Sequence, residues 1–139
     1  MDDSCVFCGL LGGDGPAVWI WRGEAASALV PKHSDWTGHT LVISNEHAVG
    51  VQDASPSAMH AVAGLVQQVA QRMGDAFHCT GVNILNASGP GSGQSVDHLH
   101  FHVVPKWGDD GMDLWPHSQQ SSHELDGEWS DLLRAELAR

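Results

Sequence analysis

Residues 93–104 read GQSVDHLHFHVV, and within this stretch three histidines alternate with apolar residues. The alternation predicts a β-strand over Val96–Val104 that the following Pro105 would end. Successive side chains of a strand point to opposite faces, so the histidines would share one face, roughly 6.5 to 7 Å apart. The core face would hold Leu99, Phe101 and Val103, and the opposite face His98, His100 and His102. Three imidazoles in a row gain little from packing, so the pattern indicates chemistry.

Two chemical interpretations of this histidine row stay open from the residues alone. In the first, the three imidazoles bind one catalytic metal, because histidines two residues apart can converge on zinc. The nearest acid, Asp97, points to the wrong face for that site. In the second, one histidine is a nucleophile and its neighbours orient it and bind an anion. The glycine-rich loop at residues 88–93 favours the second interpretation, since glycines let backbone amides approach a phosphate closely.

The other strands predicted from the sequence come mostly before the histidine row. A hairpin is expected from Ala17–Trp21 and Ala25–Val30, with a tight turn between them. Further strands are expected over His39–Ile43, which is β-branched and apolar, and over Thr80–Leu85. Together with the histidine strand these segments predict a sheet of about five strands.

One long helix is predicted between these strands. Ser55 and Pro56 are typical of a helix start, and apolar residues then recur at helical spacing as far as Met73. This helix should end near Gly74 or one turn later, and a short amphipathic helix is expected over Trp129–Leu137. The pattern predicts an α+β fold in which an antiparallel sheet packs against a long central helix.

Composition limits the classes of function. The 139 residues are 42% hydrophobic and 17% charged, as expected of one globular domain. Six Lys and Arg against 17 Asp and Glu give a formal net charge of −11, which opposes binding to nucleic acid but allows a small phosphate ligand. No apolar run is long enough for a membrane span, and the acidic start is unlike a secretory signal. We therefore expect a cytoplasmic protein without membrane contact.

The cysteines suggest a metal or redox site. Cys5 and Cys8 have C-x-x-C spacing, which fits half of a zinc site or a redox dithiol. The residues that follow do not offer the strand–helix junction of a thioredoxin-type redox motif. Cys79 is expected to be a small buried hydrophobe.

With these motifs in place, the sequence resembles the histidine triad (HIT) superfamily. The matching segments are CVFC at 5–8, GHTLVI at 38–43, GQSV at 93–96 and HLHFHVV at 98–104. The chain looks most like the Hint branch, whose members are small homodimeric nucleoside phosphoramidases and related nucleotidyl hydrolases. The resemblance implies one HIT domain over residues 1–139, with a core at about 5–106 and a C-terminal tail at 107–139.

The resemblance also implies roles for individual residues. His100 would attack the α-phosphorus of a nucleotide and form a nucleotidyl-histidine intermediate, with its Nδ1 proton held by a backbone carbonyl. His102 would contact the phosphoryl oxygens, and Ser95 with the amides of Gly93 and Gln94 would stabilise developing charge. His39 would lie behind the triad and support its orientation.

The same resemblance assigns the nucleotide and zinc sites. Asn86 would help to shape the nucleotide site, although it stands one residue further from Gln94 than in the family. Pro31 occupies the place of an acidic residue that grips the ribose hydroxyls, which implies weaker selection for a ribonucleoside. The nearby Ser34-Asp35-Trp36 loop offers an indole either to the base or simply to solvent. A structural zinc would be held by Cys5, Cys8, His47 and His98.

The expected activity is therefore hydrolysis of a nucleoside monophosphate from an amine, acyl or phosphate leaving group. Suitable substrates would be an adenosine phosphoramidate or a dinucleoside polyphosphate, and the protein would be a homodimer. One alternative is a metal-dependent enzyme that uses the triad as ligands, and another is a nucleotide-binding regulatory module with little turnover. The remaining histidines are expected to be ordinary surface or helix residues: His33, His60, His78, His117 and His123.

Overall fold

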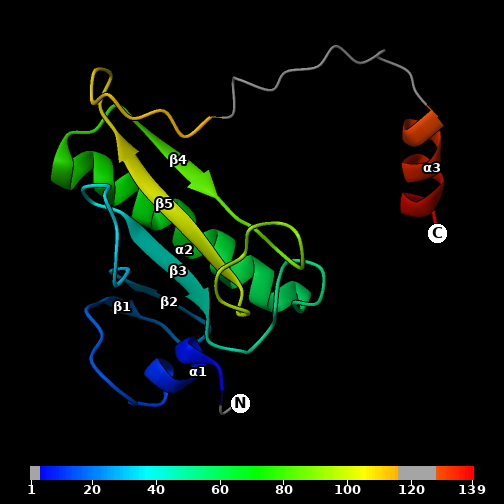
Figure 1. Ribbon diagram of the computed structural model, residues 1–139, viewed down its shortest axis with the longest axis horizontal. Helices are drawn as coiled ribbons and strands as arrows, with labels where there is room; N and C mark the ends of the chain where they lie inside the picture. The colour runs from blue at the N-terminus through cyan, green and yellow to red at the C-terminus, as the bar shows by residue number, and fades with distance from the viewer. Residues whose placement is uncertain (1–3, 116–127) are drawn as a thin grey trace.

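The computed structural model describes residues 4–115 and 128–139 and has the predicted α+β architecture (Figure 1). Its elements in chain order are α1 (Val6–Leu11), β1 (Trp19–Arg22), β2 (Ala26–Leu29), β3 (Thr40–Ser44), α2 (Pro56–Phe77), β4 (Gly81–Leu85), β5 (His100–Lys106) and α3 (Glu128–Leu137). The five strands form one antiparallel sheet in the order β1-β2-β3-β5-β4. The strand with the histidines therefore lies inside the sheet, between β3 and β4.

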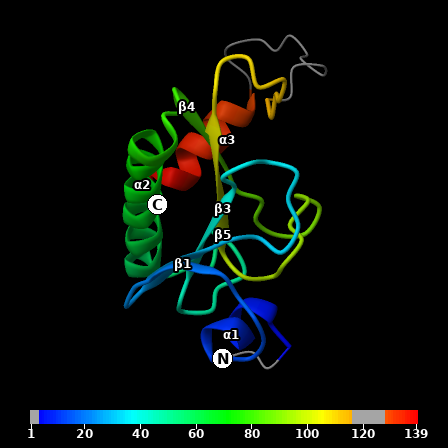
Figure 2. The same cartoon turned by 90° about the vertical axis from the view of Figure 1, so that its left-hand side faces the viewer.

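Helix α2 covers one face of the sheet, and the short helix α1 lies at one end of the molecule (Figures 1 and 2). Ser55 caps α2 by accepting a hydrogen bond from the Ala58 N–H at 3.1 Å, and Pro56 occupies the first turn, where a missing N–H costs nothing. The helix ends at Phe77, one turn beyond Gly74, as the sequence predicted. His78 follows in the left-handed conformation with φ 55°.

Two apolar clusters lie on opposite faces of the sheet. The first joins α2 to Val42 of β3, to Val103 of β5 and to Leu99, which directly precedes β5. The second joins Leu41 and Ile43 to the helix α1 region. Because alternate residues of β3 serve the two clusters, all five of its residues are buried. The sheet face that includes Leu41 and Ile43 is therefore partly covered by α1, and His100 and His102 of β5 pair with these two residues.

The predicted bounds of the histidine strand were wrong at both ends. Strand β5 begins at His100 because residues 95–98 form bends, in which the His98 N–H bonds to the Val96 carbonyl at 2.8 Å. Pro105 does not end the strand and instead pairs with Val82 of β4. Strand β3 pairs with β5 only as far as Val103, so the proline lies where one side of β5 has lost its partner.

Helix α1 was not predicted, since its six residues are too few to show a helical period. Helix α3 was predicted, and none of its described residues is buried. His117 and His123 fall outside the described residues. Within residues 4–115 and 128–139, no helix has both the length and the apolar character that crossing a bilayer requires.

Candidate active site and metal-ligand cluster

The middle histidine of the row, His100, has one ring nitrogen fixed by its own chain. Its Nδ1 lies 2.7 Å from the backbone carbonyl oxygen of His98, a distance at which Nδ1–H donates to that oxygen. The proton is then on Nδ1, and Nε2 carries the lone pair. Asn86 donates from Nδ2 to the His100 carbonyl at 2.9 Å and so holds the backbone beside it. His100 is 4% exposed, which keeps bulk water from competing for these bonds.

A chain of polar groups runs away from His100 on the side of β3. The His102 Nδ1 lies 2.8 Å from the His39 Nε2, and the His39 Nδ1 lies 2.6 Å from the Ser34 Oγ. Burial, together with the neighbouring charges of His100 and His39, lowers the pKa of His102 to about 4. Burial also lowers the pKa of His39. Both rings are therefore neutral at pH 7, and the tautomer of each ring decides which of its nitrogens donates a hydrogen bond and which accepts one.

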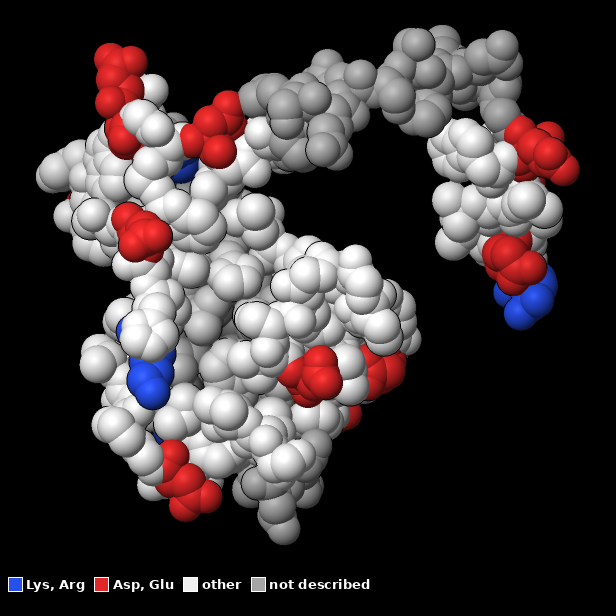
Figure 3. Space-filling view, viewed as in Figure 1, with Lys and Arg blue, Asp and Glu red and all other residues white. Residues whose placement is uncertain are grey.

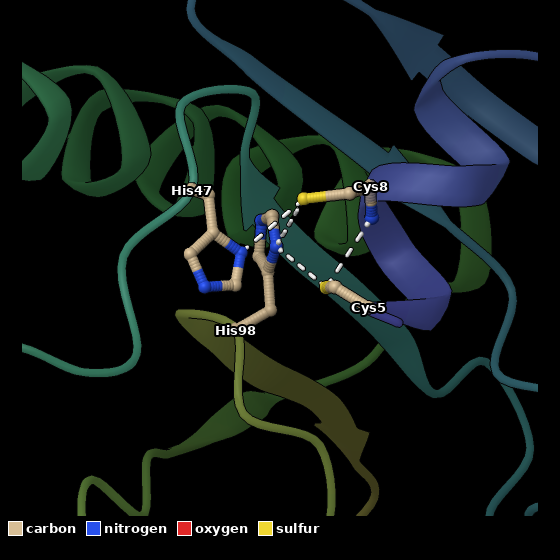
Figure 4. A group of neighbouring side chains, drawn as sticks. All are labelled: Cys5, Cys8, His47 and His98. Atoms are coloured by element: carbon tan, nitrogen blue, oxygen red, sulfur yellow. Dashed lines mark hydrogen bonds between the residues drawn. The ribbon is translucent and has the colours of Figure 1, made fainter. Parts of the chain in front are cut away.

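His98, the first histidine of the row, faces a different set of partners, which Figure 4 draws. Its Nδ1 lies 3.3 Å from the Cys5 Sγ and 3.6 Å from the Cys8 Sγ, and the His47 Nδ1 lies 3.2 Å from the Cys8 Sγ. The four ligand atoms all lie within 4.8 Å of one another. Among the described residues, this is the one group of three or more His, Cys, Asp or Glu that could hold a metal ion.

The tautomer of His98 suits a metal ligand. Its Nε2 lies 2.6 Å from the Ser44 carbonyl oxygen, so the ring proton belongs on Nε2 and the Nδ1 lone pair points at the cysteines. Burial lowers the pKa of His98, which keeps the ring neutral. Burial also raises the pKa of the Cys5 thiol, so a thiolate there requires a nearby cation. The structure thus brings together all four predicted ligands.

The glycine-rich loop before the triad is braced by one side chain. The Gln94 Oε1 accepts from the Gly89 N–H at 2.7 Å, and its Nε2 donates to the carbonyls of Val49 at 2.6 Å and Val96 at 2.9 Å. Gly93 has φ +91°, a conformation that favours glycine. The Gln94 side chain therefore shapes the loop and leaves ligand contacts to backbone amides. Ser95 is exposed, and no hydrogen bond between described residues joins it to the triad.

Two residues near the site, Phe7 and Ser34, had no assigned role in the sequence analysis, and Trp36 was expected to face either the base or solvent. Phe7 sets its ring edge-on to His98 and His100, with centroids 5.7 and 5.4 Å apart, and so holds α1 against the triad. Ser34 bonds to His39, and Trp36 packs on the His39 ring at 5.1 Å. The apolar residue inside the C-x-x-C motif was a usable signal for Phe7. No sequence spacing identifies Ser34, because its contact depends on the path of its loop.

Acidic groups predominate on the face of the molecule that Figure 3 draws. Lys and Arg of the described residues appear there only as small separate patches, among more numerous acidic groups. A formal net charge of −11 opposes contact with a run of phosphates.

Comparisons with known proteins agree with this geometry. The HIT domain family model matches residues 13–109. "Protein hit" of Bacillus subtilis is 32% identical over 106 residues, covering 76% of this chain and 73% of that protein. An adenosine 5'-monophosphoramidase of Schizosaccharomyces pombe is 32% identical over 124 residues, covering 88% of this chain and 90% of that protein.

A solved structure has the same fold. A zinc-bound histidine triad family protein from Mycobacterium smegmatis has a TM-score of 0.75 and 34% identity, covering 97% of this chain and 94% of that one. The chain described here has a histidine row of which His100 and His102 lie on β5, and a Cys₂His₂ cluster that includes His98. The chain belongs to the HIT domain family.

Proposed function

We propose that this protein cleaves a nucleoside monophosphate from an amine, acyl or phosphate leaving group through a covalent nucleotidyl intermediate on His100. The observation that carries the proposal is the 2.7 Å contact between the His100 Nδ1 and the His98 carbonyl. It fixes the tautomer in which Nε2 is unprotonated, and only an unprotonated ring nitrogen can attack phosphorus. No reorganisation of the ring is then needed at the moment of reaction.

The reaction would proceed in two displacements. With an adenosine phosphoramidate, the Nε2 lone pair forms a bond to the α-phosphorus, the phosphorus–nitrogen bond breaks, and the amine leaves with a proton taken from solvent, to which the attacking water of the second step returns one. Water then attacks the nucleotidyl-histidine, the phosphorus–Nε2 bond breaks, and AMP is released. The His98 carbonyl accepts the Nδ1–H throughout, and it stabilises the positive charge that the imidazole gains when it is nucleotidylated.

The other site residues would bind the phosphoryl group. His102 would donate to a non-bridging oxygen, with His39 behind it, and the amides of Gly93 and Gln94 would stabilise charge that develops in the transition state. Ser95 would serve the leaving group after a modest movement of the loop. Asn86, whose Nδ2 already bonds to the His100 carbonyl, would contribute to the nucleotide site mainly by holding the triad backbone.

The substrate class rests on the family. The S. pombe relative is named an adenosine 5'-monophosphoramidase, and we extend to this chain an AMP-like group with an amine, acyl or phosphate leaving group. A homodimer would follow from the same family relationship.

The Cys₂His₂ cluster would hold a structural zinc. Tetrahedral bonds of about 2.3 Å to sulfur and about 2.0 Å to nitrogen separate the two ligand atoms by roughly 3.5 Å. Three of the four sulfur–nitrogen distances in the cluster, from 3.2 to 3.6 Å, fit that geometry, and all four ligand atoms lie within 4.8 Å of one another. Four protein ligands leave no open position, so the ion would stabilise the fold and fix His98.

The two alternative functions have less support. For a catalytic metal on the triad, His98 would have to leave either the cysteines or the Ser44 carbonyl, because both of its ring nitrogens already have partners. A regulatory module with little turnover would not require the fixed His100 tautomer. We keep both as outcomes of the experiment below.

The test is release of amine from an AMP phosphoramidate by wild type and by His100→Ala, each before and after brief treatment with a chelator. His60→Ala is the matched control, since His60 is an exposed histidine on α2. We expect wild type and His60→Ala to turn over, with activity that survives brief chelation. We expect His100→Ala to lose at least about 10³-fold in kcat, as for removal of a nucleophile.

A second readout separates the alternatives. Acid-quenched single-turnover mixtures should contain protein carrying one nucleotidyl group in wild type and none in His100→Ala. Activity abolished by the chelator while the fold persists would favour the catalytic metal. Nucleotide affinity with neither turnover nor a covalent adduct would favour the regulatory module.

A further inference from the structure

The histidine pair behind the nucleophile ends on a hydroxyl from the loop that precedes β3. The Ser34 Oγ lies 2.6 Å from the His39 Nδ1, and the His39 Nε2 lies 2.8 Å from the His102 Nδ1. We propose that Ser34 is a positioning residue that sets the tautomers of His39 and His102, so that His102 presents an Nε2–H donor to the phosphoryl group. The role of His102 toward the phosphoryl group rests on the proposed function. The assignment of the His39 and His102 tautomers does not depend on it.

The direction of the hydrogen bonds follows from the single proton on the Ser34 hydroxyl. Its oxygen already accepts the Trp36 N–H at 3.1 Å. Two acceptors lie near the hydroxyl proton, namely the His39 Nδ1 at 2.6 Å and the Trp36 carbonyl at 3.5 Å. Hydroxyl donors bond at about 2.5–3.0 Å, so the proton goes to His39. In the reverse direction the Ser34 oxygen would accept both the Trp36 N–H and the His39 Nδ1–H, and the proton of this exposed hydroxyl would be left to solvent or to the carbonyl at 3.5 Å.

The rest of the chain is then determined. His39 accepts on Nδ1, so its own proton lies on Nε2 and is donated to the His102 Nδ1. His102 accepts on Nδ1, which leaves its proton on Nε2, on the far side of the ring from His39. Burial keeps both rings neutral by lowering the pKa of each, and that of His102 to about 4. Each neutral ring carries a single proton, so if the hydrogen bonds ran in the opposite direction His102 would have no proton on Nε2.

The direction has a chemical consequence. A phosphoryl oxygen carries negative charge, which an Nε2–H stabilises and an Nε2 lone pair repels. Packing helps to hold the arrangement, because Trp36 lies against His39 and brings the loop over it, with centroids 5.1 Å apart. Ser34 thus affects phosphate binding only indirectly, through the tautomers of His39 and His102, and does not itself contact the substrate.

The tautomer is measured directly on histidine-labelled protein by two-bond ¹H–¹⁵N correlation spectra, with His102→Gln assigning the signal. We expect the Nε2–H tautomer for His102 in wild type and in Ser34→Thr, which keeps the hydroxyl. In Ser34→Ala we expect a substantial population of the Nδ1–H tautomer. Thr37→Val is the control, as an exposed residue of the same loop, and should match wild type.

The kinetic arm uses the AMP phosphoramidate. We expect Ser34→Ala to lower kcat about 5- to 10-fold, the range of one lost hydrogen bond, with little change in KM and recovery in Ser34→Thr. An Nδ1–H tautomer in wild type, or an unchanged His102 tautomer in Ser34→Ala, would overturn the proposal. A merely structural role would alter stability without moving the tautomer. The spectra need no substrate. An inactive wild type would therefore refute the proposed function, while the spectra would still show which tautomer His102 adopts.

Discussion

His98 and His102 lie four residues apart and flank His100, yet the structure places them in unlike surroundings. His98 is completely buried, with its Nδ1 facing two sulfurs and its Nε2 on the Ser44 carbonyl. His102 is half-buried and bonds to His39. Two histidines of one short segment are thus a candidate metal ligand and a candidate phosphate donor. Their neighbours in space, from α1 and from the loop before β3, make the difference.

The two regions also act on His100 in different ways. The metal-ligand cluster reaches it through the backbone, since the residue that faces the cysteines also supplies the carbonyl on the His100 Nδ1. The His39–His102 pair reaches it through side chains, with the His100 and His102 ring centroids 5.1 Å apart. We therefore expect damage to the cluster to cost mainly stability, and damage near His39 and His102 to cost mainly chemistry.

The largest effect on stability is expected from Cys8→Ser. Losing one of four ligands removes bound metal from a buried cluster, so the free energy of unfolding should fall by about 3–5 kcal/mol. Metal content by mass spectrometry and chemical denaturation measure the two effects. Cys79→Ser is the matched control, since Cys79 is half-buried and outside the cluster, and should cost about 1 kcal/mol or less. Equal losses in the two variants would mean that the cluster holds no stabilising metal.

A smaller loss of stability is expected from Gly38→Ala, in the region of the His39–His102 pair. Gly38 has φ +79°, and an added Cβ would lie 2.6 Å from the Pro105 Cγ, so the residue before His39 and β3 would have to shift. We expect a loss of about 2–3 kcal/mol, measured by denaturation, with metal content unchanged.

Gly64→Ala is the control for this substitution. Gly64 lies inside α2, and nothing stands within 4 Å of its added Cβ, so the change should raise stability by about 0.5–1 kcal/mol. If Gly38→Ala were also neutral or stabilising, the close approach of this turn to Pro105 would not constrain His39.

The smallest effect is the pH dependence that His102 contributes. Its pKa in the folded protein, about 4, is below its value of 6.5 in the unfolded chain, so the unfolded state binds the proton first. Its contribution is therefore complete above about pH 6.5 and is lost as the pH falls toward 4. Between pH 7 and 5 we expect wild type to lose about 1 kcal/mol more than His102→Gln, after allowance for solvent screening. Parallel stability curves for the two proteins would contradict the lowered pKa.

The site could be predicted from sequence wherever its members share a regular element or a short motif. The alternation in HLHFHVV placed three histidines on one face, and the structure has Leu99 and Val103 in the α2 core, as expected. The strand bounds could not be predicted, because residues 95–98 bond to one another and Leu99 bonds to Ala48 before β5 begins. The Leu99–Ala48 contact joins segments about fifty residues apart, and local sequence pattern carries no information about it.

The sequence by itself determined the α+β fold, the long helix α2 and the presence of a reactive histidine row, because backbone periodicity and side-chain type are local properties. The family resemblance added the grouping of the cysteines with His47 and His98. Only the tertiary structure decided which ring nitrogen each histidine exposes. That choice depends on single acceptors and donors brought from elsewhere in the chain, namely the Ser44 carbonyl for His98 and the Ser34 hydroxyl for His39. A proton shared over less than 3 Å is set by such contacts, and they exist only once the chain has folded.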